Sequence, residues 1–100
     1  MVAKTNAIYL GYEDYEKCDE YGVIVKKAYF QFLTYDVESS TGITRARVLG
    51  CSATHGSEKY NDLMSNVPEK LERCVLDLDI YINPVTNVAQ TPKIVRVCEV

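Results

Sequence analysis

Aromatic, basic and amide side chains alternate along one stretch of the chain, at a spacing that would bring them together. Within residues 23–37 the odd positions include Lys27, Tyr29, Gln31 and Tyr35, and a strand places every second side chain on the same face. Planar rings stack on nucleic-acid bases, and cations pair with the phosphates between the bases. These residue types at this spacing predict a surface that binds a single nucleic-acid strand.

Two arginines in the next apolar stretch extend the predicted surface. The segment that precedes Arg45 and Arg47 is rich in turn residues, so we expect a β-hairpin here. A hairpin that closes symmetrically about Ser39 places Arg45 opposite Leu33 and Arg47 opposite Gln31. A shift by one residue would bury both arginines at a high cost in free energy, which favours the symmetric register.

The opposite face of this hairpin is expected to be the core. Phe30 and Phe32 occupy even positions, and the symmetric register places them beside Ala46 and Val48. Residues 23–50 carry four bases and two acids, a local charge of +2 in a chain of net charge −3. Tyrosine and arginine also pack across strands without any ligand, so simple sheet stabilisation is the competing explanation for the predicted face.

An acidic segment precedes this basic hairpin. Residues 13–22 contain five acids and one lysine, and no apolar period marks a core face. We therefore expect an exposed loop whose charge repels phosphate. Tyr12, Tyr15 and Tyr21, beside and within it, are therefore poorer candidates for nucleic-acid contacts. Residues 13–20 are expected either to contact a partner protein or to fold away from the nucleic acid.

The elements that would position these residues follow from periodicity and turn signals. Ser57 is a suitable N-cap for a short helix over residues 57–65, in which Tyr60, Leu63 and Met64 share a face. We expect strands over residues 7–12, 23–37, 43–52, 71–82 and 93–100. This order predicts a mainly β fold, a five-stranded OB-like antiparallel barrel with one short helix between strands 3 and 4. An α+β roll or an SH3-like barrel would give a similar order.

Length and composition define the broad class of protein. One hundred residues, 47% apolar and 25% charged, are typical of a single globular domain spanning residues 1–100. No apolar run reaches the roughly 18 residues of a membrane span, and no signal peptide is evident at the start. We therefore expect a cytoplasmic protein, without membrane contact, whose four widely spaced cysteines are reduced thiols.

Catalysis is not expected. Asp77 and Asp79 share a strand face, as in some metal-dependent nucleases, but no supporting third ligand follows. His55, the one histidine, has no orienting acid nearby in the sequence. We therefore predict a protein that is not an enzyme and that has no metal and no cofactor.

The layout of the chain resembles that of a known group of proteins. The long second strand with its hairpin is followed by Val67-Pro68-Glu69-Lys70-Leu71, by Asp77-Leu78-Asp79-Ile80-Tyr81-Ile82-Asn83-Pro84 and by Lys93-Ile94-Val95-Arg96-Val97. This layout resembles the small single-stranded-DNA-binding proteins of bacterial viruses and plasmids, and most closely the helix-destabilising proteins of filamentous phages. The acidic segment departs from that pattern.

The resemblance implies a homodimer that coats single-stranded DNA in phage or plasmid replication, in the cytoplasm of a bacterial host. Carried over to this chain, the matching positions are Tyr29, Gln31, Tyr35, Arg45 and Arg47, and the residue pattern adds Lys27. The alternative hypothesis is a small acidic phage-type protein that binds and inhibits a host protein, since an acidic surface can imitate nucleic acid.

Overall fold

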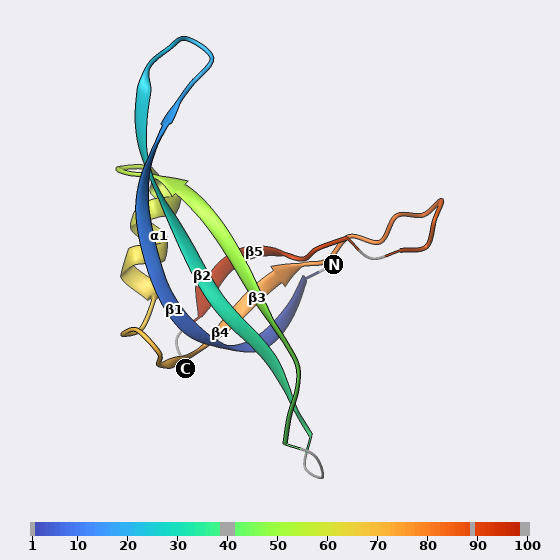
Figure 1. Cartoon of the computed structure of the whole chain (residues 1–100). Helices are drawn as coiled ribbons and strands as arrows, with labels where there is room; N and C mark the ends of the chain where they lie inside the picture. Colours follow the sequence, from blue (N-terminus) through green and yellow to red (C-terminus); the bar gives the residue numbers. More distant parts are fainter. Residues whose placement is uncertain (1, 39–41, 89, 99–100) are drawn as a thin grey trace.

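The computed structural model describes residues 2–38, 42–88 and 90–98, and it is a mainly β structure with one short helix (Figure 1). The elements in chain order are β1 (Val2–Cys18), β2 (Ile24–Glu38), β3 (Gly42–Thr54), α1 (Glu58–Asn66), β4 (Arg73–Asp79) and β5 (Lys93–Cys98). All four strand pairings are antiparallel, in the order β3-β2-β1-β4-β5. The predicted five strands and the position of the helix are therefore confirmed.

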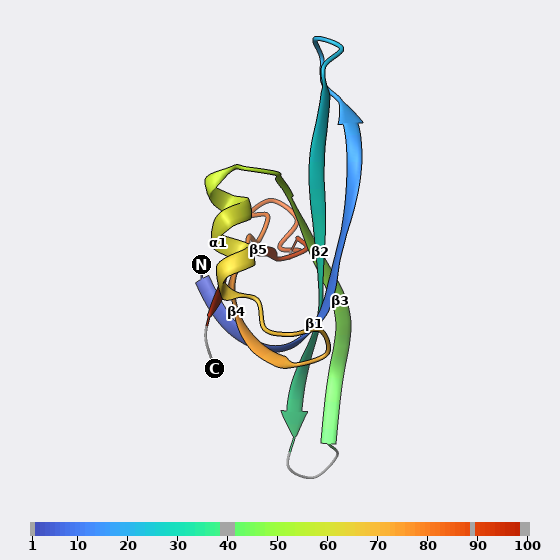
Figure 2. The ribbon, with the colours of Figure 1, turned by 90° about the vertical axis from the view of Figure 1, so that its left-hand side faces the viewer.

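The sheet curls but does not close. Its terminal strands, β3 and β5, come near each other, yet no hydrogen-bonded ladder joins them in the described residues. Figure 2 shows α1 and β5 on one side of the long β1–β2–β3 ribbon. The order of elements along the chain is the one predicted, but the sheet is not closed in the described residues, so the predicted OB-like barrel is not confirmed.

Strand β1 is much longer than expected, and the prediction of an acidic loop is wrong. The register of β1 with β2 runs without a break from Gly11 opposite Gln31 to Cys18 opposite Ile24. Figure 1 shows this end of the hairpin extending beyond the rest of the sheet, so its side chains lack a core to face. An extension that is solvated on both faces has no apolar period, which is why its sequence is typical of a loop.

The register between β2 and β3 also differs from the prediction. Gln31 pairs with Gly50 rather than with Arg47, a displacement of three positions along β3. Because side chains alternate with a period of two, an odd displacement exchanges the faces of β3. Arg47 therefore lies on the same face as Phe30 and Phe32, not on the face of Gln31.

Two local features together produce this displacement. Glu38 pairs with Gly42, whereas symmetric closure about Ser39 would pair it with residue 40, so the pairing is shifted by two positions without exchanging faces. The pairing shifts by one more position between Thr34 and Asp36. A single extra residue of this kind is a β-bulge, and it reverses every face beyond it.

The core lies inside the curl of the sheet. Phe30 and Phe32 are fully buried, as predicted, but their partners in β3 are Cys51 and Leu49 in place of Ala46 and Val48. Burying aromatic rings of this size stabilises a fold by roughly 1.5–3 kcal/mol each. The inner face is completed by the following buried side chains from the other elements: Tyr9, Leu63, Cys74, Leu76, Leu78, Ile94 and Val97.

Helix α1 covers one end of this core. The oxygen of Ser57 accepts a hydrogen bond from the amide of Tyr60 at 3.2 Å, which confirms the predicted N-cap. Leu63 is buried and Tyr60 is packed against the core, whereas Met64 is exposed. The nine residues of α1 are far too few to cross a membrane, and the described residues form no longer helix.

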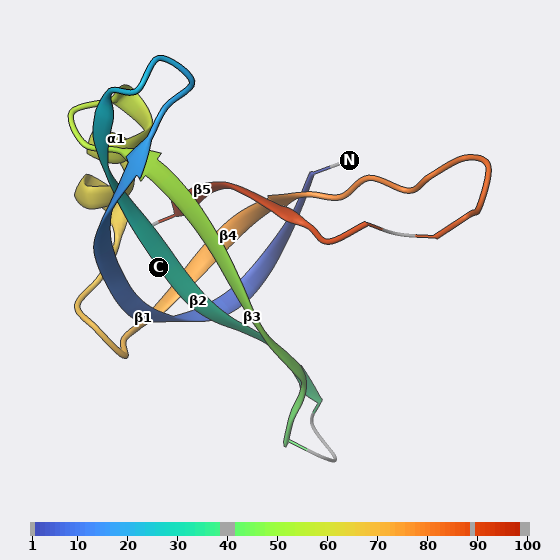
Figure 3. The same cartoon turned by 45° about the horizontal axis from the view of Figure 1, so that its top comes forward.

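The segment between β4 and β5 leaves the body as an arm (Figures 1 and 3). The amide of Gln90 donates to the carbonyl of Tyr81 at 2.9 Å, and the amide of Asn83 donates to the carbonyl of Val88 at 3.0 Å. Residues 80–92 contain no charged side chain, and Val85 is 91% exposed. The arm is thus an uncharged loop closed by two backbone hydrogen bonds, and most of its described residues are exposed.

Candidate nucleic-acid interface

The outer face of β2 carries three of the six residues predicted from the sequence. Lys27, Tyr29 and Gln31 alternate with the buried Ala28 and Phe30, so all three point away from the core. Their partners in β3 are Thr54, Ser52 and Gly50. The structure therefore brings a cation, a ring and an amide together on one open surface.

The side chain of Tyr29 lies across β3, over Gly50, rather than extending straight out from the sheet. A side-chain carbon built on Gly50 would be only 2.1 Å from the Tyr29 hydroxyl oxygen and 2.3 Å from the ring carbon that bears it. The phenol end thus occupies the space that any larger residue at Gly50 would take. Tyr29 remains 40% exposed in this position, as a base-stacking residue must be.

A hollow between β3 and β5 begins at this tyrosine. It has a volume of about 470 Å³, and Gly50 and Ser52 line it together with Tyr29. Lys59 from the first turn of α1 and Lys93 from the start of β5 supply its two charges, and no acidic residue lines it. Within the described residues neither lysine has an ion pair, so both ammonium groups are available to phosphates.

The two lysines were missed because they are distant in the sequence. Lys59 belongs to a helix and Lys93 to the last strand, and only the curl of the sheet brings them beside β3. The expected OB-like topology does contain a signal for Lys93, because it places the third and fifth strands side by side. The alternation of side chains within one strand does not reveal which residues from distant segments lie beside that strand.

The other three predicted residues do not join this surface. Tyr35 is 8% exposed, so its ring is not available to stack on a base. Arg47 is exposed, but it lies opposite Thr34 on the other face of the ribbon. Arg45 belongs to β3, and its side chain is outside the described part of the structure.

No protein-family model, no curated protein and no solved structure matches this chain.

The charges around Tyr29 differ on its two sides. On the β1 side its cross-strand neighbour is Glu13, and a carboxylate repels phosphate. On the β3 side the hollow carries Lys59 and Lys93. The side of Tyr29 toward β3 and β5 is therefore the side that favours an anion.

His55 has an acidic partner that is distant in the sequence. Its Nε2 atom lies 2.6 Å from Oδ1 of Asp14, and its ring centre lies 4.4 Å from that of Tyr60. The amide of His55 also donates to the carbonyl of Lys26 at 3.0 Å. These contacts attach the β1–β2 hairpin to the turn before α1, which is a structural role.

Asp77, on β4, forms ion pairs with both of its neighbouring strands. Its carboxylate lies 2.8 Å from Nζ of Lys4 and 2.5 Å from Nε of Arg96, one partner on each neighbouring strand. Hydrogen bonds from Lys4 and then from Arg96 lower the pKa of Asp77 to about 2. Among the described residues, no three His, Cys, Asp or Glu side chains are grouped to hold a metal ion.

Proposed function

We propose that this protein binds single-stranded DNA without sequence specificity, through base stacking on Tyr29 and phosphate contacts from Lys59 and Lys93. A protein that binds a single nucleic-acid strand needs exposed aromatic rings beside a cationic groove, and this surface has both. In this proposal the curled sheet acts as an OB-like fold, with β2 and β3 as its binding face. The resemblance in layout to phage and plasmid proteins supports a role in the replication of such an element.

The observation that carries the proposal is the position of Tyr29. The ring is half-exposed, it lies against Gly50, and it borders a hollow lined by two lysines that have no ion pair among the described residues. Asp79 is the cross-strand neighbour of Lys93 but does not line the hollow. Simple sheet packing accounts for an exposed tyrosine, but it does not require two lysines beside it. The hollow is therefore better explained by an anionic ligand.

Titration with oligo(dT) tests the proposal. We expect binding at low salt that quenches tyrosine fluorescence, and we expect Tyr29→Ala to weaken it by roughly 5- to 150-fold, the cost of losing one stacked base. Tyr29→Phe keeps the ring and should bind nearly as well. For Lys59→Ala/Lys93→Ala, the slope of log K against log salt should decrease by about 1.4, since each phosphate contact on a single strand contributes about 0.7.

The expected homodimer has a candidate surface in the uncharged arm, residues 80–92. Tyr81, Ile82, Val85 and Val88 expose apolar side chains on the arm, and grouped exposed apolar side chains favour association with a partner surface. An arm without cations is unsuited to phosphate. We therefore propose that two copies of the chain associate through their arms.

A second candidate function is supported by the acidic hairpin. Glu13, Glu16 and Glu20 are exposed and have no ion pair among the described residues, and the hairpin projects as an ordered ribbon. Such a surface suits a basic partner protein, as expected for an inhibitor that imitates nucleic acid. Failure to bind any single strand at low salt, together with capture of a host protein that is lost in Glu13→Lys/Glu16→Lys/Glu20→Lys, would favour this function.

A further inference from the structure

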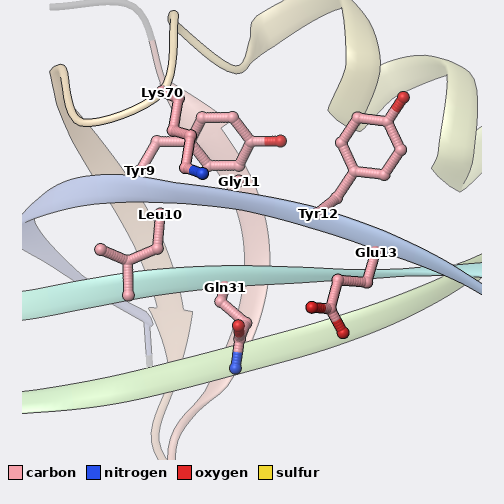
Figure 4. Close-up of a pocket in the computed structure, with 7 residues that line it drawn as sticks. All are labelled: Tyr9, Leu10, Gly11, Tyr12, Glu13, Gln31 and Lys70. Carbon is pink, nitrogen blue, oxygen red and sulfur yellow. The ribbon is translucent and has the colours of Figure 1, made fainter.

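A second hollow, with a volume of about 420 Å³, lies at the edge of β1 around Gly11 (Figure 4). In Figure 4, Tyr12 and Lys70 lie on one side of the β1 ribbon, and Gln31 and Glu13 lie on the other. The hollow thus extends over the strand from the outer face, where Gln31 neighbours Tyr29, to the side that carries α1. We refer to it as the Gly11 crossing.

Gly11 opens this crossing because it has no side chain. It has a φ of +106° and follows an irregularity in the pairing of β1 with β2, a backbone conformation that glycine adopts without strain. A side-chain carbon at this position would lie 3.6 Å from Cε of Lys70 and would fill the space beside it. Strand β4 pairs with β1 only as far as Ile8, so no described strand covers this edge.

The far side of the crossing repeats the chemistry of the outer face. The ring of Tyr12 is stacked on Phe30 with ring centres 5.3 Å apart, which supports it from beneath, and the residue is 43% exposed. Lys70 is exposed and has no ion pair in the described part of the chain. Aromatic rings and unpaired ammonium groups are the two components of a site for single strands.

Backbone hydrogen bonds hold Lys70 in place beside β1. The amide of Leu71 donates to the carbonyl of Tyr9 at 2.6 Å, and the amide of Tyr9 donates to the carbonyl of Glu72 at 3.0 Å. The residue next to Lys70 is therefore bonded directly to the strand that it crosses. The stem of Lys70 consequently passes beside Gly11 rather than extending freely into solvent.

We infer that a DNA strand bound on the outer face continues past Gln31, crosses β1 at Gly11 and stacks a second base on Tyr12, with a phosphate on Lys70. This inference rests on the proposed function and adds the path of the strand to it. Glu13 borders the crossing, so base edges rather than phosphates pass it. A carboxylate accepts a hydrogen bond from the amino group of cytosine, which makes the contact compatible with a base.

Oligomers of two lengths test the path. Wild-type protein should bind dT12 more tightly than dT4, because a longer strand on the proposed path adds contacts at Tyr12 and Lys70 to those at Tyr29. For Lys70→Ala we expect a smaller gain, and with dT12 a decrease of about 0.7 in the slope of log K against log salt. Tyr12→Leu, which keeps an apolar side chain against Phe30, should also reduce the gain, by about 5-fold or more for the lost stacked base.

A charge-matched control variant accompanies these measurements, and two different negative results distinguish failure of the proposed function from failure of the path. Lys17→Ala removes an exposed lysine of β1 that does not line the crossing, and it should leave the length dependence unchanged. If wild-type protein binds neither oligomer at low salt, the proposed function fails. If wild-type protein binds and Tyr29→Ala weakens binding, yet Lys70→Ala and Tyr12→Leu behave as wild type with dT12, the path alone is wrong.

Discussion

At the scale of single residues, the candidate site depends on two glycines, which have no side chain, as much as on its aromatic and basic residues. Gly50 allows Tyr29 to lie across β3, and Gly11 leaves the edge of β1 open beside Lys70. Neither glycine has a side chain that could itself bind a ligand. Their contribution is to leave room beside a ring or a cation that has to meet a ligand.

Gly50→Ala should weaken the binding of single-stranded DNA without unfolding the protein. The new methyl group would overlap the Tyr29 hydroxyl, 2.1 Å away, so the ring has to swing aside. Alanine in a strand costs no stability, and it is favoured over glycine there by about 0.5–1 kcal/mol. Oligo(dT) affinity and thermal unfolding, measured on the same variant and on Ser52→Ala as a neighbouring control, check this. Unchanged affinity would show that the position of Tyr29 does not matter.

Asp77 should make the fold sensitive to acid. Its pKa is lowered to about 2 from an ordinary value of 3.8, so the unfolded chain takes up this proton first. The stability contributed by the ionised group is therefore complete above about pH 4 and is lost as the pH falls toward 2. Urea unfolding between pH 2 and 6 should show this loss in the wild type, a smaller loss in Asp77→Asn, and no difference between the wild type and Glu69→Gln, an exposed control. An equal loss in Asp77→Asn would contradict the assignment.

At the scale of elements, the short helix is the part whose local signals and tertiary position agree. Ser57 both caps α1 and donates to the carbonyl of Thr54 at 2.6 Å, so it joins the helix to the end of β3. The helix in turn presents Lys59 to the hollow beside β3. Its first turn therefore matters for the candidate site as well as for the core.

Ser57→Ala should destabilise the protein by about 1 kcal/mol, because an amide at the start of α1 loses its partner. Ser57→Asp restores a capping oxygen and should recover most of that loss. Chemical denaturation measures both, and Ser65→Ala is a matched control, since Ser65 donates only to the carbonyl of Asn61 within the helix. Equal stability of Ser57→Ala and Ser65→Ala would show that the cap contributes nothing.

At the scale of the whole molecule, three extensions project from a small core. The β1–β2 hairpin is acidic, the β4–β5 arm is uncharged and apolar, and the β2–β3 ribbon carries Arg47 (Figures 1 and 3). Each extension thus has a different chemistry and suits a different partner. The core holds these extensions in fixed directions around the lysine-lined hollow.

Replacing both exposed valines of the arm, as Val85→Asp/Val88→Asp, should yield a monomer that remains folded. Both side chains are solvated in one copy, so charges there leave the core intact, but they would be costly in an apolar interface. Sedimentation gives the oligomeric state and circular dichroism gives the fold, with Val95→Asp on β5 as an exposed control off the arm. Wild-type protein that is monomeric at high concentration would overturn the proposed dimer.

Much of the fold follows from local pattern. The alternation of Phe30 and Phe32 with Tyr29 and Gln31 determined which face of β2 is buried, because burial of large rings outweighs other preferences. The capping residue and apolar spacing determined α1 nearly to the residue. On the same strand, Lys27, Tyr29 and Gln31 lie on the outer face as predicted, whereas Tyr35, which was predicted with them, is buried.

The tertiary structure decided which segments of the chain lie beside one another and in which register. Two register changes in the hairpin displaced β3 by three positions, which reversed its faces, moved Arg47 away from Gln31 and put Gly50 beside it. Pairing with β2 made a strand of the acidic segment, and the curl of the sheet brought Lys59 and Lys93 together. The period of a strand specifies how its own side chains alternate, but register and curvature depend on neighbours that are distant along the chain, so the sequence alone determined the faces and the structure decided which of them meet.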